Sequence, residues 1–391
     1  MTDAVIVSAC RTAVGTAYKG TLSETSAFDL AEPVVRELVR RTGIAADLID
    51  DLILGEVMYG GGNIGRHTAV RLGLGSVPGT AVQRQCASSL GAIQYAAAGV
   101  MAGMESAVIA GGAHSSSTAP VLSRRIPGTD EIEDKWMSPS HPDTPDAPNR
   151  DMSITVGWNA AEIGGVSRAD MDAWALRSHQ RAVRAQDEGR FAEEIVPIEV
   201  VRKDGTTTVF DRDEHPRRDT TAEKLAGLRV LHPEIDGFSI TAGNSSGIND
   251  AAAAVLVVSA EFAREYGLTP LAVIRGWSSV GVDPVETGLA PAVAIPKALH
   301  RAGLKLGDIA LFEINEAFAA MCVATTRALG ISEEIVNISG SGISLGHPIA
   351  ASGARMVTTL IGDLRRAGGG LGVAAMCAGG GMGSALVLEA L

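Results

Sequence analysis

Cys86 is the first residue whose surroundings in the sequence favour chemistry. In "VQRQCASSLGAI" it directly precedes a run of small and apolar residues that predicts a helix. Unpaired N–H groups and the helix dipole at a helix N-terminus lower the pKa of a thiol and so favour the nucleophilic thiolate. A cysteine in such a position is also commonly a small core residue without chemistry. Taken alone, the stretch leaves both interpretations open.

Three further residues stand beside glycine turns or helix starts and suit acid–base or oxyanion chemistry. His347 lies in "SGSGISLGHPIAASGAR", where the glycines allow the backbone to approach a ligand closely. Cys377 ends an apolar strand-like run in "MCAGGGMGSA", which suits an acid–base thiol with backbone N–H groups beside it. Asn315 in "INEAFAA" either positions a water molecule or caps the following helix. Two thiols, a histidine and an asparagine together suggest acyl transfer through a thioester.

A weak internal repeat indicates how these residues come together. Two pairs of segments are alike: Arg41–Val57 with Arg301–Asn315, and Glu105–His114 with Val373–Gly383. The first pair is a helix end, a turn and an apolar strand, and the second pair is a strand that ends in a glycine turn. Cys86 lies between the markers of the first copy and His347 between those of the second. We therefore expect a duplicated α/β unit in which Cys86 and His347 converge.

The elements that must position these residues follow from the hydrophobic pattern. Apolar strand-like runs alternate with helical patterns, which predicts an α/β protein with sheets covered by helices on both faces. A helix is expected over Arg168–Asp187, with Ser167 marking its start. Residues 123–150 carry several prolines and acidic residues without any period, which predicts an exposed loop. The expected strands include Ala4–Ser8, Leu52–Leu54, Ala107–Ala110, Ala253–Val258 and Ala272–Arg275.

Composition argues against several classes of partner and cofactor. A net charge of −12 over 391 residues argues against nucleic acid, because phosphate binding requires a surplus of Lys and Arg. The four cysteines show no metal-binding spacing, so we expect no metal site and free thiols in a reducing compartment. No apolar run reaches the length of a membrane span, and the N-terminal residues lack a signal-peptide pattern. We therefore expect a cytoplasmic protein without a membrane partner.

Taken in order, these motifs resemble the thiolase family of acetyl-CoA acetyltransferases and 3-ketoacyl-CoA thiolases. The resemblance runs nearly end to end, through "ACRTAVG", "CASSLGA", "AGNSSGINDAAAAV", "NEAFA", "GHPIAASGAR" and "CAGGGMG". It implies the thiolase fold: two duplicated α/β halves with five-stranded sheets covered by helices in layers, plus an inserted loop domain. It also implies reversible CoA-dependent cleavage of a 3-ketoacyl-CoA to acetyl-CoA and a shortened acyl-CoA, or the reverse Claisen condensation. No cofactor is implied, since CoA itself is a substrate.

The resemblance implies a role for each candidate residue. Cys86 takes the acyl group, His347 accepts its proton and helps to stabilise the thioester oxygen, and Cys377 shuttles the second proton. Asn315 holds a water molecule in one oxyanion site, and the backbone N–H groups of Cys86 and Gly379 form the other. A covalent acyl-enzyme divides one difficult step into two easier ones.

The resemblance also implies a division of the chain and a place for CoA. The expected parts are an N-terminal half over 1–118 that is completed by about 249–268, an inserted loop domain over 119–248 that covers CoA, and a C-terminal half over 269–391. The basic residues of the insert supply the positive charge that a 3′-phosphate needs. The expected CoA contacts are Met152, Arg217, Arg218, Lys224, Ala242, Ser246 and Phe318. A homodimer or homotetramer that acts on CoA and acyl-CoA is expected.

Several residues depart from the family pattern near the nucleophile and the acyl pocket. The departures include Gln83 for Asn, Ser89 for Gly, Asp151 for His, Thr287 for Met and Ala350 for Gly. Because all four proposed catalytic side chains are present, we expect an active enzyme in which these changes affect the choice of substrate. Two alternatives stay open. One is an acetoacetyl-CoA-specific biosynthetic acetyltransferase, and the other is a thiolase-like protein that binds acyl-CoA without turning it over.

Overall fold

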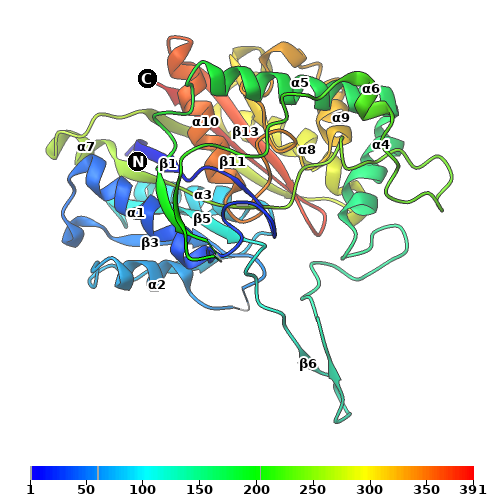
Figure 1. The fold of residues 1–391 in the computed structure, drawn as a ribbon. Coiled ribbons are helices and arrows are strands. Elements are labelled where there is room, and N and C mark those ends of the chain that lie inside the picture. The colour runs from blue at the N-terminus through cyan, green and yellow to red at the C-terminus, as the bar shows by residue number, and fades with distance from the viewer. Residues whose placement is uncertain (1, 60, 203) are drawn as a thin grey trace.

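One ten-stranded mixed sheet forms the centre of the computed structural model, which describes residues 2–59, 61–202 and 204–391 (Figure 1). Its strands are Ala4–Arg11 (β1), Gly15–Thr16 (β2), Asp51–Gly55 (β3), Thr80–Val82 (β4), Ala107–Ser115 (β5), Asn249–Ser259 (β10), Ala272–Gly281 (β11), Leu311–Ile314 (β12), Gly370–Ala378 (β13) and Met382–Ala390 (β14). Their order across the sheet is β12-β13-β14-β11-β1-β10-β5-β3-β4, and β2 pairs with β10. All five strands expected from the sequence are present, and each extends beyond its predicted bounds.

The sheet contains the same four-strand pattern twice. In the first half β3 is parallel to β5, β5 is antiparallel to β10, and β10 is antiparallel to β1. In the second half β12, β13, β14 and β11 repeat these relations in the same order. The two halves meet where β1 pairs with β11 at Val5–Val273 and Ile6–Ala272. The predicted duplication is therefore confirmed, within one continuous sheet in which β4 adds a fifth strand to the first half.

Helices cover both faces of this sheet. They are Ala27–Thr42 (α1), Ile64–Arg71 (α2), Ser88–Met101 (α3), Asn159–Gly164 (α4), Arg168–Asp187 (α5), Ala222–Ala226 (α6), Ala260–Glu265 (α7), Ala290–Ala302 (α8), Ala319–Leu329 (α9) and Ser352–Arg366 (α10). Helices α3 and α10 share a hydrophobic cluster with strands of both halves, whereas α1 packs on the opposite face of the first half and α8 on that of the second. Shorter helical segments are Ala46–Leu48, Ser153–Trp158, Pro284–Leu289, Leu306–Asp308 and Glu333–Ile335.

The contact between α3 and α10 is unusually close because small residues face each other there. A Cβ atom placed on Gly353 would lie 2.5 Å from the backbone nitrogen of Leu90. Helix α3 is buried on nearly all sides, as expected for a helix whose residues are mostly small or apolar. The two helices that begin just after Cys86 and His347 are therefore fixed against each other.

The predicted helix over Arg168–Asp187 is confirmed, and its start is stabilised by a capping box between Ser167 and Asp170. Its residues Met171 and Trp174 pack in the cluster of the second half, whereas Ala182 packs in that of the first half. Helix α5 thus lies across both halves.

The segment around Arg124–Arg125 (β6) projects from the body as an arm (Figure 1), whereas His141, Ala147 and Asn149 further along the predicted loop are buried. The exposed loop predicted over 123–150 is confirmed in outline, but it contains a short hairpin of β6 and Ile132–Glu133 (β7). An ion pair from Arg124 Nε to Glu133 Oε2 at 2.8 Å and a left-handed turn at Gly128 favour this pairing. Another two-stranded sheet joins Ile198–Val201 (β8) and Thr207–Phe210 (β9). No helix in the described ranges is long and apolar enough to cross a membrane.

The close contact of α3 and α10 generates a test of stability. We expect Gly353→Ala to lower the free energy of unfolding by about 1–3 kcal/mol, because the new methyl group would force the two backbones apart. Gly307→Ala is the matched control, since a Cβ atom there meets nothing within 4 Å. Denaturant titration of both variants measures the difference, and equal stabilities would contradict the proposed tight contact.

Candidate active site

Cys86 lies in a tight turn between β4 and α3. The preceding residue, Gln85, adopts a left-handed conformation with φ of +46°, which is uncommon for a residue with a side chain. Two side chains hold this turn. The Gln85 N–H donates to Gln83 Oε1 at 3.1 Å, and the Ser88 hydroxyl donates to the Gln85 carbonyl at 2.6 Å. Gln83, a departure from the family pattern, thus stabilises the backbone that presents the thiol.

Two backbone N–H groups point at the Cys86 sulfur, and a second thiol lies near it. Desolvation raises the pKa of Cys86 to about 11, while hydrogen bonds from the N–H groups of Gly379 and of Cys86 itself act in the opposite direction. Burial at the end of β13 raises the pKa of Cys377 even further, and the nearby Cys86 adds to this effect. Both thiols are therefore protonated at neutral pH, and Cys86 needs a base before it can attack.

His347 has the protonation state of a base. Its Nδ1 lies 2.6 Å from the Ser352 hydroxyl. That hydroxyl donates its proton to the Pro348 carbonyl at 2.9 Å. Because the hydroxyl proton is used on that carbonyl, we assign the ring proton to Nδ1, which leaves Nε2 free to accept. Burial, with a smaller contribution from the charge of Arg355, lowers the pKa of His347 to about 3. The imidazole is thus neutral near pH 7.

Asn315 follows β12 and is fully buried beside this histidine. Its Nδ2 lies 3.3 Å from Nδ1 and 3.4 Å from Nε2 of His347. Its Oδ1 has no hydrogen-bond partner among the described residues. An unpaired buried amide oxygen is costly, so this position fits a bound water molecule.

The helix starts that follow Cys86 and His347 contact each other directly. The Ala354 N–H in the first turn of α10 donates to the Ser89 hydroxyl of α3 at 3.0 Å, and α10 has no cap from its own chain segment. The sequence predicts that Ser89 affects the choice of substrate, and that stays a prediction. In the structure its hydroxyl is directed at α10 and joins the two halves.

Thr287 also has a role that the sequence pattern did not indicate. Its hydroxyl accepts the Gly381 N–H at 3.0 Å and donates to the Pro284 carbonyl at 2.6 Å. Gly381 belongs to the glycine turn that contains Gly379. The threonine therefore anchors the turn that supplies the second N–H group to Cys86.

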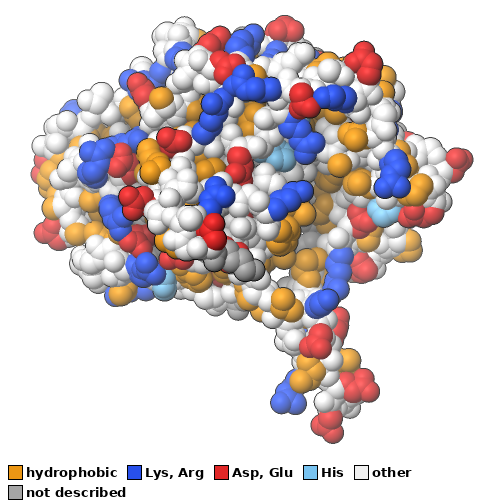
Figure 2. All heavy atoms as spheres, viewed as in Figure 1, with side chains coloured by type: hydrophobic (Ala, Val, Ile, Leu, Met, Phe, Trp, Pro, Cys, Tyr) orange, Lys and Arg blue, Asp and Glu red, His pale blue; other side chains and the backbone are white. Residues whose placement is uncertain are grey.

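A cavity of about 700 Å³ lies between the segments Thr16–Lys19, 215–231 and 242–248. Four of the expected CoA contacts line it, namely Arg217, Lys224, Ala242 and Ser246. The cavity wall includes Ile248, whose backbone forms a bridge with that of His347. Leu228 and Leu231, partly exposed, add apolar surface. On the face seen in Figure 2, hydrophobic side chains gather where the surface is hollowed, with basic side chains around them.

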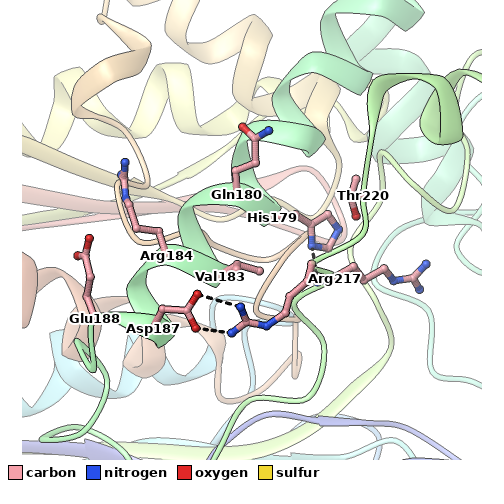
Figure 3. Close-up of a pocket in the computed structure, with 9 residues that line it drawn as sticks. His179, Gln180, Val183, Arg184, Asp187, Glu188, Arg217 and Thr220 are labelled. Atoms are coloured by element: carbon pink, nitrogen blue, oxygen red, sulfur yellow. Dashed lines mark hydrogen bonds and ion pairs between the residues drawn. The ribbon is translucent and has the colours of Figure 1, made fainter.

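The other three expected CoA contacts do not line this cavity. Arg218 lies in a neighbouring hollow of about 360 Å³, where its Nη1 donates to Asp187 Oδ2 at 2.8 Å (Figure 3). Phe318 is buried, and its ring packs on Gly157. Met152 lies at the catalytic centre, since a Cβ atom on Gly379 would be 3.8 Å from its sulfur. In the part of the chain that the structure describes, no cluster of His, Cys, Asp and Glu side chains is arranged to hold a metal ion.

Comparison with known proteins agrees with this arrangement. The family model described as thiolase, N-terminal domain, matches residues 4–261, and that described as thiolase, C-terminal domain, matches residues 268–390. The chain is 42% identical to a "3-ketoacyl-CoA thiolase" of Bacillus subtilis and 42% identical to a "Beta-ketoadipyl-CoA thiolase" of Acinetobacter baylyi, with full coverage of both chains in each case. It is 40% identical to an "Acetyl-CoA acetyltransferase" of Syntrophomonas wolfei, over 100% of this chain and 99% of that protein.

A solved structure shows the same fold. The acetyl-CoA acetyltransferase of Bacillus anthracis superposes with a TM-score of 0.90 at 38% identity, over 100% of this chain and 99% of the other. Both family models and the relatives cover the whole length over which the motifs were found in the sequence. The resemblance that those motifs carry is thereby confirmed, and the chain belongs to the thiolase family.

Proposed function

We propose that this chain cleaves a 3-ketoacyl-CoA with CoA to acetyl-CoA and a shortened acyl-CoA, and catalyses the reverse condensation, through an acyl-Cys86 intermediate. One observation carries the proposal: the Cys86 thiol lies under two N–H groups and beside the Cys377 thiol, and the helices that begin after Cys86 and after His347 contact each other directly. The relatives named above support the same class of reaction, an acyl transfer between CoA thioesters.

In the first half-reaction His347 Nε2 takes the Cys86 proton, and the thiolate attacks the 3-keto carbon of the substrate. The negative charge on that oxygen is stabilised by the N–H groups of Cys86 and Gly379. The bond between C2 and C3 then breaks, and the leaving carbanion of acetyl-CoA is protonated by Cys377. His347 and a water molecule on Asn315 stabilise the thioester oxygen of that carbanion.

In the second half-reaction the thiol of CoA attacks the acyl group on Cys86. The Cys377 thiolate takes the proton of the incoming thiol, and Cys86 leaves as the free thiol after His347 returns the first proton. Each catalytic side chain thus regains its starting protonation state. The acyl-enzyme separates carbon–carbon cleavage from thioester formation.

The cavity of about 700 Å³ is the proposed site of the CoA chain. Residues 119–248 form the part that covers CoA, between the N-terminal half of 1–118 (completed by about 249–268) and the C-terminal half of 269–391. Arg217, Lys224, Ala242 and Ser246 contact CoA, and Met152 faces the acyl group. Arg218 and Phe318 do not line the cavity and support its wall from outside. The proposal requires no cofactor and no metal, and it places a homodimer or homotetramer in the cytoplasm.

The covalent intermediate gives the first test. Incubation with a 3-ketoacyl-CoA is expected to add the acyl mass to Cys86 alone, and Cys86→Ala is expected to abolish the adduct and lower kcat by roughly a thousandfold or more. Cys10→Ser is the control, because this thiol is buried away from the site. Mass spectrometry of digested protein locates the adduct. An adduct that persists without Cys86 would refute the residue assignment.

A panel of 3-ketoacyl-CoA esters separates this proposal from its alternatives. Turnover of several chain lengths is the expected result, since Thr287 leaves room where a methionine is usual in acetyl-specific members. Turnover of acetoacetyl-CoA alone would identify a biosynthetic acetyltransferase. Binding of every ester without turnover would identify a non-catalytic acyl-CoA-binding protein.

The raised pKa of Cys86 gives a second test, by alkylation of the free enzyme. Because the folded protein favours the neutral thiol, the thiolate fraction grows only as pH rises toward about 11. We therefore expect the rate of Cys86 modification by iodoacetamide to increase continuously from pH 7 to pH 10. A rate that levels off near pH 6 would indicate a preformed thiolate–imidazolium pair and would contradict the neutral site.

A further inference from the structure

We propose that Tyr18 and Lys19 form a nucleotide-binding wall of the cavity, in which the Tyr18 ring stacks on the adenine of CoA and Lys19 contacts a phosphate. This inference rests on the proposed function, because adenine and phosphates belong to the far end of the CoA molecule. Neither residue was among the contacts expected from the sequence.

Tyr18 combines a strained backbone with a side chain that is left exposed. Its φ is +66°, in the left-handed region that disfavours bulky side chains. The side chain is not held by core packing either, since 66% of the residue surface is exposed. Strain of this kind persists only where the surrounding structure imposes it, and it is concentrated at binding sites.

The turn around Tyr18 is built to impose that conformation. The Tyr18 N–H donates to the Ser117 hydroxyl at 2.7 Å, and the Ala17 N–H donates to the Ile248 carbonyl at 2.9 Å. Ser117 is held in turn by Asp250, which accepts its N–H at 3.1 Å. These contacts fix the backbone of Ala17 and Tyr18, so the point from which the ring projects is set before any ligand binds.

Glu214 ties the same turn to the segment that carries Arg217. Its carboxylate accepts the Thr16 N–H at 2.7 Å, the Thr21 N–H at 3.1 Å and the Thr21 hydroxyl at 3.0 Å. The carboxylate fills the space where a side chain on Gly20 would lie. The segments that carry Tyr18, Lys19 and Arg217 are thus held in fixed positions relative to one another.

Charge in the cavity points to a phosphate-bearing ligand. Tyr18, Lys19, Arg217, Asp219 and Lys224 all line it. Lys224 is neutralised by Asp219, whose Oδ2 lies 2.6 Å from its Nζ. Among the described residues, Lys19 and Arg217 have no side-chain ion pair or hydrogen bond. An exposed aromatic ring beside two unpaired cations matches a heteroaromatic base that carries phosphates.

Substitution of Tyr18 by glycine tests the proposed nucleotide contact while the protein stays folded. Glycine adopts positive φ freely, so Tyr18→Gly is expected to raise the denaturation midpoint while it raises KM for CoA at least about fivefold, the lower limit of a base–aromatic stack. The value of kcat is expected to stay unchanged. Tyr18→Phe keeps the ring and should retain the wild-type KM. Tyr266→Ala is the control, because it removes an exposed tyrosine at the C-terminal end of α7.

Pantetheine, which lacks the nucleotide, separates ligand contact from structural damage. With pantetheine as the acyl acceptor, Tyr18→Gly is expected to match the wild type, and Lys19→Ala should raise KM for CoA alone. An unchanged KM for CoA in Tyr18→Gly would refute the proposed nucleotide contact. An equal rise in KM for CoA and for pantetheine would refute it as well. Absence of turnover in the wild type would instead overturn the proposed function, so the two failures are distinguishable.

Discussion

Close approach of α3 and α10 is the constraint on which the arrangement of the site depends. Each of these helices begins a few residues after one reactive group, so the distance between the helices sets the distance between the groups. Gly353 allows the backbones to touch, and the Ser89 hydroxyl caps α10 from the other half. Because α3 is surrounded by protein on nearly every side, neither helix has space in which to shift.

Desolvation then determines the protonation states of the reactive groups. A charged group in a dry site is expensive unless it is paired, and here two thiols and one imidazole are all held in their neutral forms. In the proposed mechanism, charge develops only after the substrate has entered the site. Close to His347 the buried charge of Arg355 is paired with Glu313 at 2.6 Å, whereas Lys19 and Arg217 line the cavity without an ion pair among the described residues. In the proposed function, the chemistry and the recognition of phosphate therefore involve different sets of residues.

Much of this arrangement was predictable from the sequence. The strands, the capped helix over Arg168–Asp187 and the duplication follow from local periodicity and from turn residues, which depend on near neighbours. The pairing of side chains did not follow. Arg218 was expected to bind phosphate, but it forms an ion pair with Asp187 at the end of α5. Likewise, the hydroxyls of Ser89 and Thr287 bind backbone groups far away in the chain, which no local pattern specifies.

The strand order of the sheet also bears on how the chain is made. Strand β10 lies between β5 and β1 and joins them, yet it follows both in the sequence by more than a hundred residues. While the ribosome is still producing the insert, β1 therefore has neither of its neighbours, because β10 and β11 do not yet exist. The first half of the nascent protein remains an incomplete sheet with an open edge until residue 259 has been synthesised. Such a chain exposes apolar strands for most of its synthesis and needs protection from aggregation during that time.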